Sequence, residues 1–92
     1  MQLTMDEIIN AVCLNIAERR QIRPTDVIVE LLWDEDLGYS AQITVQGQSW
    51  YIAEGALIEA IMRYLDQEYG RRVFPEQIRL DLTDEIVAHV AS

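Results

Sequence analysis

The chain contains no lysine: all seven of its basic residues are arginines, against 16 aspartates and glutamates. The formal net charge of −9 argues against the broad basic surface that proteins use to neutralise nucleic-acid phosphates or anionic lipid headgroups. We therefore expect neither a dedicated nucleic-acid-binding protein nor a protein that docks on anionic membranes.

Cysteine and histidine are nearly absent, with one residue of each, Cys13 and His89. A single cysteine excludes an intramolecular disulfide. Cys13 falls in an apolar stripe, where a free thiol usually packs as a small hydrophobe, so we do not expect a Cys13–His89 catalytic pair. The few glycines are scattered and form no phosphate-binding loop. The sequence thus predicts no catalytic residue and no cofactor.

Long apolar runs are missing as well. No stretch approaches the roughly 20 residues of a membrane-spanning helix, and the first residues lack the basic and apolar regions of a signal peptide. We expect a cytoplasmic protein. Half of the 92 residues are hydrophobic and no linker interrupts them, which predicts a single domain over residues 1–92.

Two segments have the apolar spacing of helices. The first spans about Met5 to Arg20 and follows Thr4, which has the spacing of a capping box with Glu7. The second spans about residues 54–69 and is followed by Gly70, a residue that favours the left-handed conformation at a helix end.

Other segments alternate apolar and polar residues, as strands do. Residues 27–34, 39–46 and 49–52 are separated by short turns, which predicts a three-stranded antiparallel meander. A strand is predicted at 78–82, and β-branched residues in 84–92 favour a further strand over a short helix. The fold class is therefore α+β, a two-layer sandwich in the order helix, meander, helix, strand, with both helices on one face.

Aromatic residues lie on or beside the predicted meander. Trp33 and Tyr39 occupy the apolar phases of their strands, and we expect both in the core. Trp50 and Tyr51 are neighbours in one strand, so their side chains point to opposite faces. One of these two must therefore leave the face that the helices cover.

We expect other apolar side chains beside that aromatic residue, on the face of the sheet that the helices leave open. Ile28 and Leu32 share the opposite phase of the first strand and point the same way as either Trp50 or Tyr51. Exposed aromatic residues often anchor protein partners. We expect this patch to bind a protein partner or a second copy of the chain.

Arginines gather after each predicted helix. Arg19, Arg20 and Arg23 follow the first helix, and Arg71 and Arg72 follow the second. If the helices pack in parallel, the two clusters meet at one edge and bind an anion or an acidic partner. The other interpretation, which we favour, is that these arginines compensate the helix dipoles and pair with surface carboxylates.

The most acidic segment covers residues 34–38. Asp34 and Asp36 are weak candidates for binding a hard cation, which needs six or more oxygen ligands. The flanking segments are strands, and the next acid, Glu54, is remote in sequence. Acidic residues followed by Gly38 are also what an exposed hairpin turn requires, and we favour that interpretation.

Three segments carry a resemblance to a family: residues 33–41 (Trp-Asp-Glu-Asp-Leu-Gly-Tyr-Ser-Ala), Gly47, and residues 59–61 (Glu-Ala-Ile). They resemble the YxcD-like family of short Bacillus-type proteins, over most of the chain. The resemblance implies a cytoplasmic bacterial protein. That family is a domain of unknown function, so it supplies no catalytic or binding residues.

The order helix, three strands, helix is also similar to that of the double-stranded-RNA-binding domain. Those domains hold phosphates with lysines at the start of their second helix, where this chain has Ala53-Glu54-Gly55-Ala56. Three functions stay open. They are an interaction or self-association module using the open face, a degenerate nucleic-acid module using the arginine clusters, and a small ligand-binder or enzyme with its site at a dimer seam.

Overall fold

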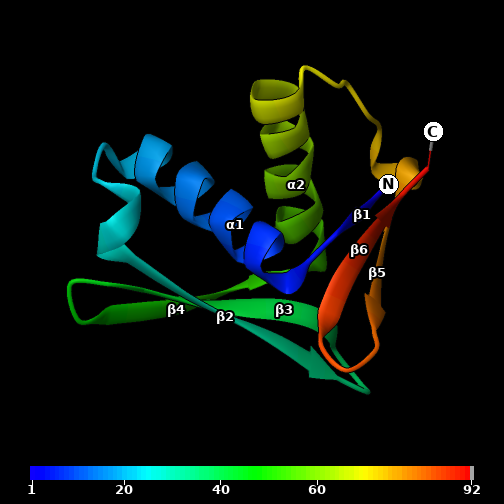
Figure 1. Cartoon of the computed structure of the whole chain (residues 1–92). Helices are drawn as coiled ribbons and strands as arrows, with labels where there is room; N and C mark the ends of the chain where they lie inside the picture. The colour runs from blue at the N-terminus through cyan, green and yellow to red at the C-terminus, as the bar shows by residue number, and fades with distance from the viewer. Residues whose placement is uncertain (92) are drawn as a thin grey trace.

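The computed structural model describes residues 1–91 and confirms the α+β class (Figure 1). The elements follow in the order β1 (Gln2–Leu3), α1 (Met5–Arg20), η1 (Pro24–Asp26), β2 (Val27–Asp34), β3 (Gly38–Val45), β4 (Gln48–Ala53), α2 (Glu54–Tyr69), η2 (Pro75–Gln77), β5 (Ile78–Leu82) and β6 (Ile86–Val90). The η elements are single turns of 3-10 helix, each starting at a proline.

Both helices have the bounds that the sequence predicts. At the start of α1, the Glu7 amide donates to Thr4 Oγ1 at 3.2 Å and the Thr4 amide donates to Glu7 Oε1 at 3.3 Å, which completes the capping box. Gly70 ends α2 in the left-handed conformation, with φ 62°. Gln21 adopts the same conformation after α1, although it lacks the freedom of a glycine.

The predicted meander is confirmed as an antiparallel sheet in the order β2-β3-β4. Gln46 and Gly47 connect β3 to β4, and both have positive φ, 51° and 80°. Two central residues with positive φ are typical of the tight turn that matches the twist of a hairpin. The register of all three strands is therefore set by short local connections.

The remaining strands form a second antiparallel sheet, in the order β1-β6-β5. The tail is a strand, β6, as predicted; Ser92 lies outside the described residues. The two-residue strand β1, which the sequence analysis does not predict, pairs with β6 through Leu3 and Ala88. The strands thus divide into two sheets, each with its own hairpin.

Both helices lie on the same side of the β2-β3-β4 sheet, and the β1-β6-β5 sheet stands beside them (Figure 1). Buried residues from both helices and both sheets join one hydrophobic core, which includes Leu3, Ile43 and Ile61. In the described part of the chain, neither helix has the length and apolar composition needed to cross a bilayer.

The two helices run in opposite directions along their contact. The Tyr69 hydroxyl, at the end of α2, donates to Glu7 Oε2 at 2.8 Å, near the start of α1. At the other end of α1, an Arg19 nitrogen lies 3.0 Å from Glu59 Oε1, in the first half of α2. The helix ends that carry the arginine clusters therefore lie apart.

Candidate functional site

The helices leave one face of the β2-β3-β4 sheet uncovered, and we call it the open face. The pairing register places on it Ile28, Glu30, Leu32 and Asp34 from β2, Gly38, Ser40, Gln42 and Thr44 from β3, and Ser49, Tyr51 and Ala53 from β4. Ile28 is 66% exposed and Tyr51 is 67% exposed. The structure thus places Ile28, Leu32 and Tyr51, three of the four residues predicted for this patch, on the same face, with Ile28 and Leu32 on β2 and Tyr51 across β3 on β4.

Trp50, the fourth residue, lies on the opposite face. It packs against the core, and the guanidinium carbon of Arg20 lies 4.2 Å from the centroid of its ring. An arginine over a tryptophan ring is a stabilising cation–π arrangement. The alternation in β4 required either Trp50 or Tyr51 to face outward, and the structure shows that it is Tyr51.

The prediction that Trp33 and Tyr39 both serve the core is wrong for Trp33. Tyr39 packs against the core, whereas Trp33 is 47% exposed. The two residues pair with each other next to the β2–β3 turn. Trp33 is the penultimate residue of β2. Its side chain points to the same face as the core residues of that strand, but it lies beyond the end of the core.

A hollow of about 600 Å³ lies at this end of the open face. It is lined by Leu32, Trp33, Asp34, Leu37, Tyr39, Ser40, Tyr51, Ile52 and Ala53. Most of these residues are apolar, and none is basic. The sequence analysis assigned no site role to Leu37, Ser40, Ile52 or Ala53. The signal available in the sequence was a single leucine within an otherwise acidic turn, and the structure shows this leucine, Leu37, 82% exposed.

The electrostatics at this end of the sheet are negative. Burial raises the pKa of the Tyr39 phenol, and the carboxylates of Asp81 and Glu54 raise it further, while Arg79 acts in the opposite direction. Asp34 itself lines the hollow. A negatively charged rim beside apolar side chains favours a ligand that combines apolar and cationic groups.

The acidic turn is held together by Asp34. Its Oδ1 accepts hydrogen bonds from the amide of Asp36 at 2.7 Å and from the amide of Leu37 at 3.1 Å. Side chains that bond to the backbone in this way are typical of tight turns. Within residues 1–91, no three potential ligands among His, Cys, Asp and Glu gather to hold a metal ion.

The two arginine clusters do not form a common anion site. They would meet only if the helices ran in parallel, and the helices run in opposite directions. Arg19 pairs with Glu59, Arg23 lies 3.5 Å from a carboxylate oxygen of Asp26, Arg71 donates to the Ala91 carbonyl at 3.0 Å, and Arg20 covers Trp50. Arg72 instead lines a small hollow beside Phe74.

Cys13 and His89 belong to separate contacts. The Cys13 thiol donates to the carbonyl of Val27 at 3.6 Å, and burial raises its pKa, which makes the thiol less reactive. His89 Nε2 lies 3.3 Å from Asp81 Oδ2 on the β1-β6-β5 sheet. Neither contact gives a nucleophile beside a base.

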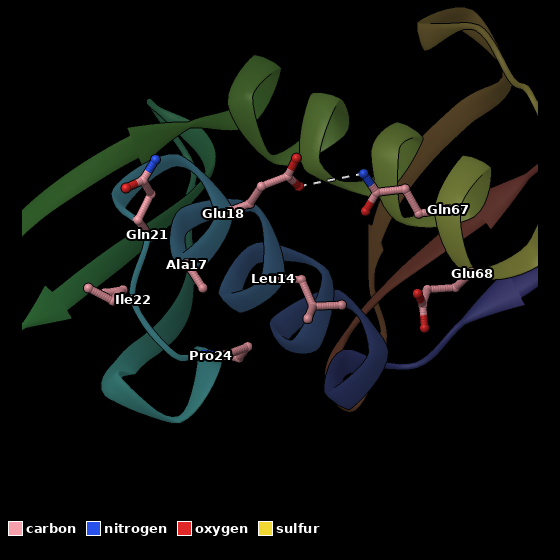
Figure 2. A pocket seen from close by; sticks show the side chains of 8 residues that line it. All are labelled: Leu14, Ala17, Glu18, Gln21, Ile22, Pro24, Gln67 and Glu68. Atoms are coloured by element: carbon pink, nitrogen blue, oxygen red, sulfur yellow. Dashed lines mark hydrogen bonds between the residues drawn. The ribbon is translucent and has the colours of Figure 1, made fainter.

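Another hollow, of about 400 Å³, lies between α1 and α2 (Figure 2). The carboxylate of Glu18 reaches across it: Oε2 accepts from Gln67 Nε2 at 3.5 Å, and Oε1 accepts from Arg63 at 2.8 Å. These polar groups satisfy one another across the helix pair. We therefore assign a structural role to this groove.

Comparison with known protein families shows which family the chain belongs to. A family model described as a protein of unknown function, DUF2653, matches residues 1–85. No curated protein and no solved structure matches the chain. The match confirms the expected membership in a family of unknown function, and the matched range includes every strand of the open face.

Proposed function

Because the chain belongs to the DUF2653 family, whose description names no activity, we propose a function from its surface alone. The protein is a small cytoplasmic protein-binding module, and its open face binds a basic partner protein. A free, half-buried Cys13 without a disulfide partner fits a reducing compartment.

The exposure of Ile28 and Tyr51 on one face of a sheet carries this proposal. Ile28 and Tyr51 lie on the two outer strands of the sheet, so a partner that spans the face would contact an exposed apolar side chain at each edge. Tyrosine is enriched among the residues that dominate binding energy, because its ring buries a large area with few rotatable bonds.

Charge favours a basic partner over a second copy. Glu30 and Asp34 are the only charged residues in the register of the open face, and both are acidic. A second copy would bring the same acidic groups, whereas a basic partner would bring complementary ones. The acidic face also repels nucleic-acid phosphates.

The size of the face limits how tightly any protein partner can bind. Three strands spaced ~4.8 Å apart and ~20–25 Å long project an area of roughly 300–350 Å². A stable, specific protein–protein interface buries about 800 Å² of each partner. We therefore expect a transient complex in which charge attraction supplements the apolar contact.

The test compares variants that add the same negative charge at different places. The tagged protein is used as bait in extracts of the cells that produce it. Ile28→Asp and Tyr51→Asp should each lose a partner that the wild type retains. Phe74→Asp is the matched control, because Phe74 is 61% exposed but lies beside η2, away from the open face. This variant should retain the partner.

The retained protein should be basic, and its recovery should fall as salt rises, because salt screens exposed charges. Equal recovery with all three variants would contradict the proposal, as would recovery of nothing by the wild type. A concentration-dependent dimer that Tyr51→Asp abolishes would replace the basic partner by a second copy. Recovery that nuclease treatment removes would point instead to nucleic acid.

A further inference from the structure

We infer that the hollow at the end of the open face receives one bulky apolar side chain of the partner, flanked on the same segment by arginine or lysine. The inference rests on the proposed function, because it specifies what the partner must present to this surface. It is carried by the shape and lining of the hollow together with the charge of its rim.

The walls of the hollow are apolar. Leu32, Tyr51 and Ala53 all point to the open face, and Leu37 adds a wall from the turn. Trp33, Tyr39 and Ile52 also line the hollow, although they occupy the alternate phase of their strands. A volume of about 600 Å³ is within the range of pockets that hold small ligands, and it accommodates a leucine or phenylalanine side chain.

The turn that carries Leu37 is held in place before any partner arrives. Asp34 Oδ1 accepts two backbone hydrogen bonds across the turn, one of them from the amide of Leu37 itself. A preformed wall lowers the entropic cost of binding, since the loop needs no further ordering. The same side chain leaves its second carboxylate oxygen free to attract a cation.

The rim selects for positive charge next to the apolar anchor. Asp34 lines the hollow, Glu35 and Asp36 follow in the exposed turn, and Glu30 lies on the same face. The residues lining the hollow include no arginine or histidine that could neutralise them. A purely apolar ligand would leave these carboxylates without a partner, and a purely basic one would leave the hollow empty.

Short peptides test this without knowledge of the partner. The probe is acetylated and amidated Arg-Arg-Phe-Arg-Arg, with one control in which alanine replaces phenylalanine and a second in which glutamate replaces each arginine. Binding is followed by amide chemical shifts of the 92-residue protein. The phenylalanine peptide should bind about tenfold more tightly than the alanine peptide, since burying an aromatic side chain is worth at least ~1.4 kcal/mol. The glutamate peptide should not bind.

Two variants locate the binding in the hollow. Ala53→Phe fills it, and this position makes no side-chain cap bond that the change would remove. Leu37→Ser removes a wall at an exposed turn position, which keeps the test valid should Ala53→Phe fail to fold. Each should reduce the affinity of the phenylalanine peptide about tenfold, as loss of one buried apolar contact predicts. Phe74→Ser should leave it unchanged.

Equal affinities of the phenylalanine and alanine peptides would overturn the inference, as would shifts centred away from Leu32, Leu37 and Tyr51. Binding of toluene with the same shifts but no preference for the basic peptide would also overturn it, in favour of an apolar small molecule. Any of these three results leaves the proposed function standing if Tyr51→Asp still abolishes partner recovery. The experiments therefore distinguish failure of this inference about the hollow from failure of the proposed function.

Discussion

The guanidinium carbon of Arg20 lies 4.2 Å from the centroid of the Trp50 ring and joins the end of α1 to β4. This contact covers the side of β4 that faces the helices. Tyr51, the next residue, consequently lies on the uncovered side. The relationship therefore decides which aromatic residue is available to a partner.

Removing the charge of Arg20 should weaken its interaction with the Trp50 ring while a side chain still covers that ring. In Arg20→Met, an unbranched side chain remains, and we expect stability to fall by about 0.5–1 kcal/mol, the usual size of a cation–π interaction. Trp50 should also become more hydrated. A red shift of tryptophan emission, measured with Trp33→Phe in both proteins so that only Trp50 reports, checks this. Unchanged emission and stability would contradict the contact.

Leu3 should matter far more than its place in a two-residue strand suggests. It is completely buried and belongs to the common core, so Leu3→Ala should cost about 2–5 kcal/mol. Leu37→Ala makes the same chemical change at an exposed turn position, and it should change stability by less than about 0.5 kcal/mol. Urea unfolding of the two variants measures both values. Similar values would show that β1 does not dock as described.

The Tyr69 phenol should lose its proton at an unusually high pH. Its hydrogen bond to Glu7 is the main cause that raises its pKa from 10.0 to about 12. Because the folded-state pKa lies above the unfolded value, this contribution to stability is complete below pH 10 and disappears as the pH rises to about 12. Glu7→Gln should lower the pKa of Tyr69 while retaining the capping box, since glutamine also serves at that position. Carbon NMR of labelled tyrosine measures this, and an unshifted Tyr69 would contradict the bond.

Asp34 should act in the turn through its hydrogen bonds rather than its charge. Asp34→Asn keeps an acceptor for the amides of Asp36 and Leu37, so it should retain stability. Asp34→Ala removes that acceptor and should cost about 1 kcal/mol. Thermal unfolding compares the two variants. An equal loss in both would mean that the carboxylate charge, and not the turn geometry, is important here.

The local structure was predictable where its causes are local. The Thr4–Glu7 capping box, the glycine at the end of α2 and the alternation of β2 and β3 each depend on neighbouring residues, and the structure confirms them. The pairing of β1 with β6 was not predictable, because two residues show no period and the partner strand lies at the far end of the chain. The division of the strands into two sheets was not predictable for the same reason, because it depends on pairing between the two ends of the chain.

The candidate site was predictable only in part. Alternation placed Ile28 and Leu32 on one face, but it could not choose between Trp50 and Tyr51, because that depends on where the end of α1 packs. The hollow depends on the path of the turn that carries Leu37, which no period encodes. The separation of the arginine clusters depends on the direction of the helices, and helix direction is a property of tertiary packing.

The most direct test of the central claim is an amide chemical-shift map of the protein with the partner recovered by the wild type and lost by Tyr51→Asp. We expect the shifted amides to cover Ile28, Leu32 and Tyr51 and to extend to Leu37. Residues of the groove between α1 and α2, such as Gln67, should not shift. A map centred on that groove, with the open face unchanged, would contradict the assignment of the open face as the binding surface.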